Sequence, residues 1–375
     1  MTRRTFLNAS TAAAVSPDWQ WDTSIKDFKS LRANAFRLSE RSVRARSAAA
    51  MPGVLSMLGE IETVRKNSST DFLKEQAPTG WLRSIDALTL RGEGYRPIQE
   101  ILIRHRERMG QCIMLKQRPK YRFQFLDALM SAPAMALWLE TQDWTNPWAV
   151  GNVDMDTAFA LAFEWKVNCN PRAQGALSAW FDWHDRKIDR SIGFWDLNRT
   201  GDVLKSMAGG MHQLGIYFLF GKEAPYHERA IEATLGLQQA NGLFSPDSFG
   251  HHGLDMDSVF VLANLYNRYG DHGPRVRSAL ERTFEANLKC FHPEGGAVSR
   301  PGIDRQPDAW SSWCRVAVAG WCARILRIPE FQGPWDFHPR QPFQSEAGGK
   351  GRPDWLDDKW YDAVDWPRPA GGSLS

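Results

Sequence analysis

Two pairs of aspartates are candidates for chemistry, because each pair places two carboxylates two residues apart at the start of a predicted helix. They are Asp154 with Asp156, and Asp255 with Asp257. Carboxylates this close can hold each other's pKa values apart, or bind a diphosphate through Mg²⁺. A simpler interpretation makes Asp156 and Asp257 helix N-caps, with Asp154 and Asp255 in positions that favour the helix dipole.

Three histidines could supply acid–base groups or ligands. His251 and His252 precede the second aspartate pair, and with it they form the densest cluster of polar ligands in the chain. The cluster could coordinate a metal or exchange protons, or it could be a solvent-exposed loop before a helix. His212 ends the glycine-rich segment 207–212, whose small residues permit close approach of a backbone or a ligand. A buried core histidine fits the same position.

The aromatic residues indicate either a very large core or a cavity for a bulky ligand, since the chain contains seventeen Trp and twenty Phe. Trp310 and Trp313 are three residues apart on one predicted helix and therefore share a face, whereas Arg315 points away from Trp313. If this helix lines a cavity, the two tryptophans and Arg315 would contact the substrate. If it lies in an outer layer, the tryptophans belong to the core.

The composition limits the class of protein that must position these residues. The chain has 375 residues, 43% of them hydrophobic and 24% charged, which is typical of a globular protein with one large domain or two. A net charge of +3 does not point to nucleic acid as a partner, and no stretch of 18 apolar residues predicts a transmembrane helix. We therefore expect a small-molecule substrate as the partner.

The two ends of the chain are predicted to lie outside the main domain. In the arm 1–26, Arg3 and Arg4 precede Phe6 and Leu7, as in a twin-arginine export signal, but the apolar stretch that follows is short. Five scattered cysteines favour a reducing compartment, so the expected location is the cytoplasm, with twin-arginine export as the alternative. Residues 329–375, rich in Pro, Gly and Trp, are predicted to form a tail.

The chain between these ends is predicted to be helical and, from residue 140 onward, repetitive. Helical spacing predicts helices over 27–51, 97–109 and 123–139, the last kinked or split near Pro133, and no strand pattern is found. Later predicted helices begin at residues 156, 207, 257 and 308, which are 51, 50 and 51 residues apart. Turns with Gly or Pro beside a bulky residue precede them, at residues 146–148, 193–195, 242–244 and 295–298. Such a repeat predicts stacked helical hairpins, which can form an open superhelix or a closed ring, and the turns rich in Gly and aromatic residues favour the ring.

Residues 237–244, with Gln238, Gly242 and Phe244, resemble the repeat of squalene cyclases and protein prenyltransferase β-subunits. The last repeat, from Gly295 to Arg315, is similar to the final repeat of that superfamily. The resemblance covers residues 140 to 326 and implies an α/α toroid, in which two layers of helices surround a cavity. In that repeat the glutamine braces a helix end, the glycine makes the turn and the aromatic packs beneath it. A closer likeness is to uncharacterised bacterial proteins with such repeats.

The chemical motifs of this superfamily match only in part. A prenyltransferase zinc site needs Asp, Cys and His, but Asp257 stands where the Cys should be and residues 310–314 provide no His, so zinc is not expected. Class II terpene cyclases protonate an alkene with an aspartic acid of a D-x-D-D motif. Both aspartate pairs resemble this motif with one Asp missing, and Mg²⁺ remains a candidate cofactor.

The sequence therefore predicts an all-α protein, with an α/α toroid over residues 27–328. The preferred function is a terpenoid-cyclase-like enzyme, with Asp154 and Asp156 or Asp255 and Asp257 as acids and the two tryptophans as a cation-stabilising wall. The alternatives are a carbohydrate-active lyase or hydrolase, using His212, His251 or His252 with an Asp, and a non-catalytic binding scaffold. Apolar rings alone in the cavity would favour the first, whereas Arg, His and carboxylates among the rings would favour the second.

Overall fold

The structure is a computed structural model of the whole chain, and the part that can be described covers most of its second half. All statements below refer to these described residues: 19–39, 53–55, 58–59, 71–78, 80–82, 102, 105–106, 108–110, 112, 117–246, 252–304 and 306–333. Residues 1–18 of the predicted arm 1–26, His251, most of the predicted helix 97–109 and the tail from residue 334 lie outside them.

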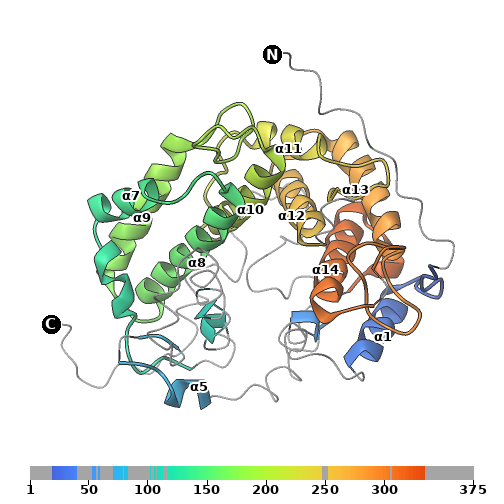
Figure 1. Ribbon diagram of the computed structural model, residues 1–375, viewed down its shortest axis with the longest axis horizontal. Helices are drawn as coiled ribbons and strands as arrows, with labels where there is room; N and C mark the ends of the chain where they lie inside the picture. Colours follow the sequence, from blue (N-terminus) through green and yellow to red (C-terminus); the bar gives the residue numbers. More distant parts are fainter. Residues whose placement is uncertain are drawn as a thin grey trace. The chain divides into compact units, whose positions relative to one another are not determined.

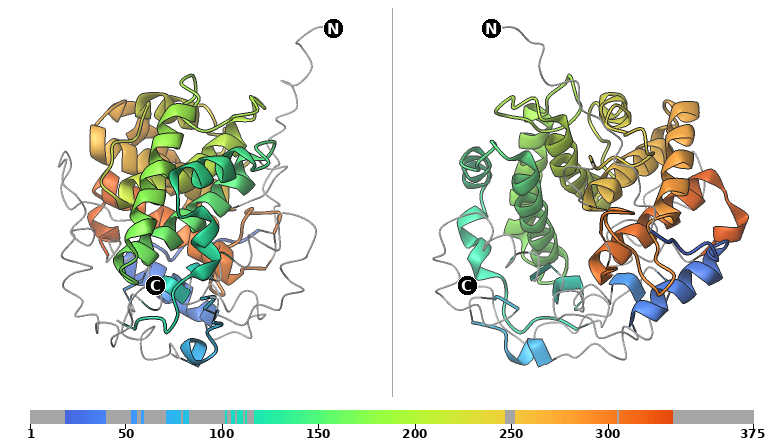
Figure 2. Two further views of the ribbon diagram at one scale, coloured as in Figure 1. Left: turned by 90° about the vertical axis from the view of Figure 1, so that its left-hand side faces the viewer. Right: turned by 45° about the vertical axis from the view of Figure 1, so that its right-hand side comes forward.

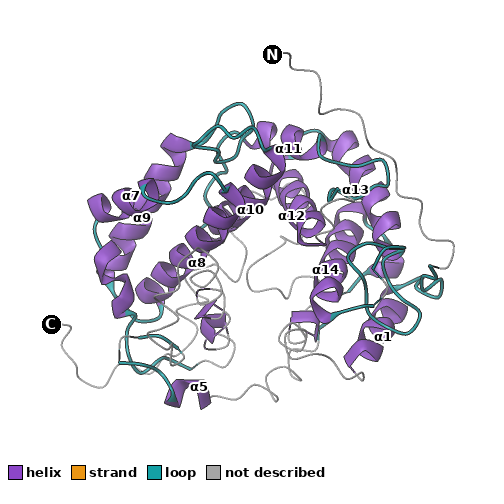
Figure 3. Ribbon diagram, in the orientation of Figure 1, coloured by secondary structure: helices purple, strands orange, loops and turns teal. Residues whose placement is uncertain are grey.

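The fold is all-α, which confirms the predicted class. Within the described residues the elements are α-helices, short 3-10 helices and turns, with no strand (Figure 3). The predicted helix 123–139 is split, as expected, into a 3-10 helix and α7, and Pro133 lies in the first turn of α7. The bounds are α1 (Phe28–Ser39), α5 (Asp71–Lys74), η2 (Gln124–Leu129), α7 (Ala132–Glu140), α8 (Pro147–Lys166), α9 (Pro171–Lys187), α10 (Val203–Leu219), α11 (His227–Leu235), α12 (His252–Tyr269), α13 (Gly273–Leu288), α14 (Ala309–Leu326) and η3 (Pro329–Phe331) (Figure 1).

Three of the four repeated helices, α8, α10 and α12, begin earlier than the pattern predicts, whereas α14 begins at Ala309. α8 starts at Pro147, where the Asn146 side chain accepts a hydrogen bond from the Ala149 N–H, and α12 already includes His252. Asp156 and Asp257 therefore lie inside helices, and the interpretation of these residues as N-caps is wrong. In a helix that is buried on all sides, the first turns show no alternation of polar and apolar faces in the sequence. The first aspartates within such a helix can therefore be mistaken for its N-terminus.

The helices divide between two compact units, one of which contains α7 to α10. There α8 and α10 run side by side, and α9 packs against both α7 and α8 (Figure 1, Figure 2). α8 and α10 can approach closely because Gly209 has no side chain. A β-carbon at this position would lie only 2.3 Å from the Pro147 carbonyl oxygen. The predicted role of the small residues in 207–212 is confirmed for backbone contact, and it places two long, buried helices next to each other.

The other unit contains α1, α13, α14 and the first part of α12. α13 packs against α14, and α1 also contacts α14 (Figure 1). The Arg277 side chain on α13 donates to the carbonyl oxygens of Ile325 and Leu326, and so caps the end of α14. α14 is buried on nearly all sides, whereas α13 keeps an exposed polar face, so α14 is the inner helix of this pair.

Glycine turns with one hydrogen-bonding pattern recur along the chain, and one of them lies outside the predicted repeat. The N–H of Gly242 donates to the Gln239 carbonyl oxygen, while the Gln239 N–H donates to the Leu243 carbonyl oxygen. Gly80 makes the same pair of bonds with Ala77 and Trp81. Both glycines adopt positive φ, and a glutamine four residues earlier, Gln238 or Gln76, donates to the glycine carbonyl oxygen. The repeat therefore extends N-terminal to residue 140.

None of the described helices combines the length and the apolar composition that would be needed to cross a membrane.

Candidate functional site

Asp154 joins three helices and faces the interior. Its carboxylate accepts hydrogen bonds from the Trp180 indole N–H, from His184 Nε2 at 2.7 Å and from Gln213 Nε2 at 3.1 Å. Asp154 and His184 are completely buried, and His184 Nδ1 lies 2.8 Å from the Trp180 carbonyl oxygen. Through these three hydrogen bonds Asp154 connects α8 to α9 and α10, and we assign it a structural role.

Asp156 points to a different set of partners. It forms a buried ion pair with Arg106, whose guanidinium also contacts the Met155 sulfur at 3.7 Å. Arg106 acts electrostatically on His212 of α10 as well. Burial of the imidazole, and then the Arg106 charge, lower the pKa of His212 to about 3. His212 is therefore neutral at physiological pH, which makes it a weak general base.

Asp255 holds a turn in place. Its Oδ1 accepts the backbone N–H groups of Phe244 at 2.7 Å and Ser245 at 2.8 Å, and its Oδ2 lies 2.8 Å from the Arg315 guanidinium. Arg315 is completely buried and also donates to the carbonyl oxygens of Val298 and Ser299. Arg315, predicted to bind substrate, and Asp255, predicted to be an acid, thus neutralise each other in a fully buried ion pair.

Asp257 differs from the other three aspartates in its electrostatics. It lies two residues after Asp255 on α12 and is 3% exposed. Burial, and secondly the negative charge of Asp255, raise the pKa of Asp257 well above its usual value. A carboxyl group with a raised pKa holds its proton to a higher pH than an ordinary aspartic acid, and it can then donate that proton.

A solvent-open pocket of about 650 Å³ lies where α12 and α14 begin. On its surface the Ser311 hydroxyl donates to Asp308 Oδ2 at 2.7 Å, and Ser311 Oγ lies 3.2 Å from His252 Nδ1. Because a serine hydroxyl has one proton, its oxygen accepts the Nδ1–H of His252. This arrangement leaves Nε2 as the basic nitrogen of the neutral imidazole. The N-cap geometry of Asp308 fixes its carboxylate, since Oδ1 accepts the N–H groups of Trp310 and Ser311.

The remainder of the pocket is mostly polar and carries an aromatic ring at its side. Asp304 binds the Arg300 guanidinium at 2.7 Å, which orients a second carboxylate. Trp310 is 40% exposed, and its ring centroid is 6.5 Å from that of His252 and 5.2 Å from that of Trp313. The pocket is lined by His252, Ser299, Ile303, Asp304, Gln306, Asp308 and Ser311.

The structure brings together only some of the predicted site residues. His252 lines the pocket, and its ring neighbours that of Trp310, which in turn contacts Trp313. Asp154, Asp255 and Arg315 instead bind other buried residues of the protein, and His251 lies outside the described residues. Sequence reasoning missed Asp304, Asp308 and Ser311 as site residues. The spacing of Asp308 and Ser311, three residues apart at a helix start, could have indicated them, because a capping pattern predicts where a helix presents polar side chains. Comparison with known proteins adds no assignment: no family model, curated protein or solved structure matches this chain.

Proposed function

We propose that this protein is a carbohydrate-active enzyme, a lyase or a hydrolase, which binds a polyhydroxylated substrate in the pocket at the start of α12 and α14. The observation that carries the proposal is the chain of contacts from Asp308 through Ser311 to His252 beside the exposed ring of Trp310. An imidazole and two oriented carboxylates in a polar pocket suit proton transfer to or from a sugar, rather than the shielding of a carbocation.

Each residue has a role in this proposal. His252 exchanges the proton through Nε2, which is buried in the structure and must become accessible when the substrate binds. Asp308, acting through Ser311, holds the tautomer and is therefore a positioning residue. Asp304 hydrogen-bonds sugar hydroxyls, and the face of Trp310 stacks on the apolar face of a sugar ring. The α/α toroid predicted from the repeat would supply a scaffold for such a pocket, and it remains a prediction.

Binding and product formation test this function together. We would titrate full-length protein with neutral and uronate-containing oligosaccharides by calorimetry, and follow new reducing ends and unsaturated uronates. Trp310→Ala should weaken saccharide binding by about tenfold, near 1.4 kcal/mol, whereas Trp21→Ala, which removes another surface tryptophan, should not. His252→Gln should abolish turnover with little loss of binding. Equal affinity of the parent protein and Trp310→Ala for every saccharide would contradict the proposal.

A second function, terpenoid-cyclase-like chemistry, is favoured by Asp257 alone. A buried aspartic acid that keeps its proton could protonate an alkene, with Mg²⁺ as a ligand for a diphosphate. In this case prenyl substrates, and not saccharides, would raise the unfolding midpoint by mass action. Asp257→Asn would abolish product formation without affecting binding of the hydrocarbon. If neither ligand class binds, the non-catalytic scaffold becomes the preferred function.

A further inference from the structure

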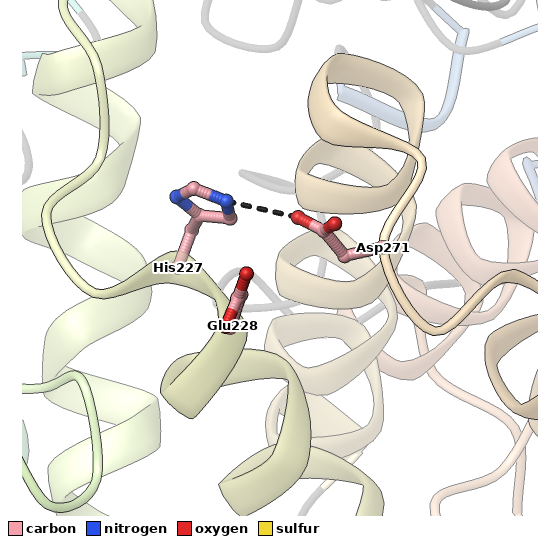
Figure 4. A group of neighbouring side chains, drawn as sticks. All are labelled: His227, Glu228 and Asp271. Carbon is pink, nitrogen blue, oxygen red and sulfur yellow. Dashed lines mark ion pairs between the residues drawn. The ribbon is translucent and has the colours of Figure 1, made fainter.

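A second cluster of ligand-type side chains lies in the unit that contains α7 to α10, apart from the proposed pocket. His227 and Glu228 begin α11, and Asp271 follows the end of α12. One ligand atom from each residue lies within 4.8 Å of the others, and His227 Nε2 is 2.9 Å from Asp271 Oδ2. Figure 4 shows the imidazole and the Asp271 carboxylate pointing at each other, with Glu228 beside them.

The environment of His227 fixes the direction of its Nε2 lone pair. Its Nδ1 is 3.3 Å from the Ala224 carbonyl oxygen, which can only accept a hydrogen bond, so Nδ1 carries the hydrogen. The ring stacks on Tyr269 with centroids 3.7 Å apart and planes 12° from parallel. The Tyr269 hydroxyl in turn accepts the Ala224 N–H at 2.9 Å. A histidine held by a carbonyl at one nitrogen and directed outward at the other has the second-sphere arrangement of a metal ligand.

In the neutral tautomer, His227 Nε2 and the Asp271 carboxylate are two acceptors in contact, and this contact requires a cation between them. The cation can be a proton, which makes an ion pair, or a metal ion. Glu228 favours a metal, because it places a third ligand atom within 4.8 Å of the other two, which a metal ion can use and a proton bridge does not. All three side chains reach solvent, with those of His227 and Asp271 27% and 31% exposed, so an ion can enter. The His184–Asp154 pair is completely buried, and no third ligand completes it into such a cluster within the described residues.

We propose that His227, Glu228 and Asp271 form a site for a divalent transition metal of the zinc class, with water completing the coordination. One imidazole and two carboxylates suit Zn²⁺ better than Ca²⁺ or Mg²⁺, which prefer oxygen ligands alone. Ligands at 2.0–2.2 Å around a tetrahedral ion are about 3.4 Å apart. The histidine–aspartate pair must therefore open slightly, and the exposed Glu228 side chain must move inward. The bound ion would tie the segment that begins α11 to the segment that ends α12.

The chain provides a matched control for this site. His272 Nδ1 lies 3.0 Å from Glu232 Oε1 with similar exposure, but no third ligand completes that pair into a metal cluster within the described residues. Cys169 is an exposed thiol that could bind zinc by itself, so the parent protein for the experiment carries Cys169→Ser. Untagged full-length protein would be stripped with a chelator and titrated with Zn²⁺ by calorimetry, and Co²⁺ spectra would report the ligand set.

We expect one Zn²⁺ per chain in the parent protein, and a rise of several degrees in the unfolding midpoint at saturating Zn²⁺. His227→Ala should weaken Zn²⁺ binding at least tenfold and remove the shift of the midpoint, whereas His272→Ala should change the affinity less than threefold. Asp271→Asn should also weaken binding, in case the alanine variant disturbs the Tyr269 stack. No Zn²⁺ uptake by the parent would leave the pair bridged by a proton, and equal loss in both histidine variants would indicate non-specific binding. Either result overturns the proposal.

Discussion

The Asp255 carboxylate lies 2.8 Å from the Arg315 guanidinium, and neither side chain is exposed to solvent. This buried pair connects α12 to α14 within one unit, and the N–H groups of Phe244 and Ser245 complete the coordination of the carboxylate. In a buried ion pair, the attraction between the two charges offsets the free-energy cost of their desolvation.

Replacing Arg315 with Met should be strongly destabilising, because it leaves the Asp255 charge buried without its counter-charge. We expect the free energy of unfolding to fall by about 3–5 kcal/mol in urea titrations. Arg300→Met removes an ion pair that is partly exposed, so it should cost less than about 1 kcal/mol. The double variant Asp255→Asn/Arg315→Met should regain part of the loss. A loss no greater in Arg315→Met than in Arg300→Met would show that the buried pair contributes little.

Asp257 should make stability depend on pH. Its pKa is raised in the folded state, so above the pKa of the unfolded state, near 3.8, folding requires the uptake of a proton. Stability from this group is complete in acid and is lost as the pH rises towards the folded-state pKa, by at most about 1.4 kcal/mol per pH unit. Asp257→Asn keeps the shape of the protonated acid without the titration. We expect the variant to be more stable than the wild type at pH 7, and the difference in free energy to shrink towards pH 4.

Thermal unfolding of the wild type and of Asp257→Asn across this pH range measures the difference in their free energies of unfolding, once the midpoints are converted with the enthalpy of unfolding. A constant difference from pH 4 to pH 7 would mean that Asp257 titrates normally in the folded protein.

Gly209 on α10 is needed for the close approach of α8. Substitution of Gly215, on the same helix, provides the control for this requirement. A β-carbon on Gly209 would lie 2.3 Å from the Pro147 carbonyl oxygen, whereas one on Gly215 meets no atom within 4 Å. Gly209→Ala should cost about 1–3 kcal/mol, because the two helix backbones must separate. Gly215→Ala should stabilise the protein by about 0.5–1 kcal/mol through helix propensity. Denaturant midpoints that shift in the same direction for both variants would argue against this packing.

Gly242 makes the repeat turn, and it combines positive φ with tight packing. Its φ is +88°, and an added β-carbon would lie 2.7 Å from the Arg282 carbonyl oxygen. Gly270 also has positive φ, at +73°, but an added β-carbon there meets open space. Gly270→Ala should therefore cost only the backbone strain, about 1–2 kcal/mol, and Gly242→Ala should cost at least 1 kcal/mol more. If both variants lose the same free energy of unfolding in urea, the positive φ alone accounts for the loss and the tight packing around Gly242 contributes nothing.

The sequence alone indicated the all-α class, the order of the later helices and the glycine turns, because these follow from local rules of periodicity and turn geometry. It placed the starts of α8 and α12 too late, since buried aspartates inside these helices resemble caps. The turn at Gly80 was overlooked, although its glutamine and glycine repeat the spacing of Gln238 and Gly242.

Only the tertiary structure decided what each aspartate does. Asp154 and Asp255 occupy matching positions in their repeats, yet one binds a histidine and a tryptophan, and the other binds Arg315 and a turn. The partners that distinguish these two carboxyl groups lie tens of residues away in the sequence, so packing rather than spacing determines them. The same reason applies to the pocket: His252 and Ser311 come together only when the starts of α12 and α14 meet.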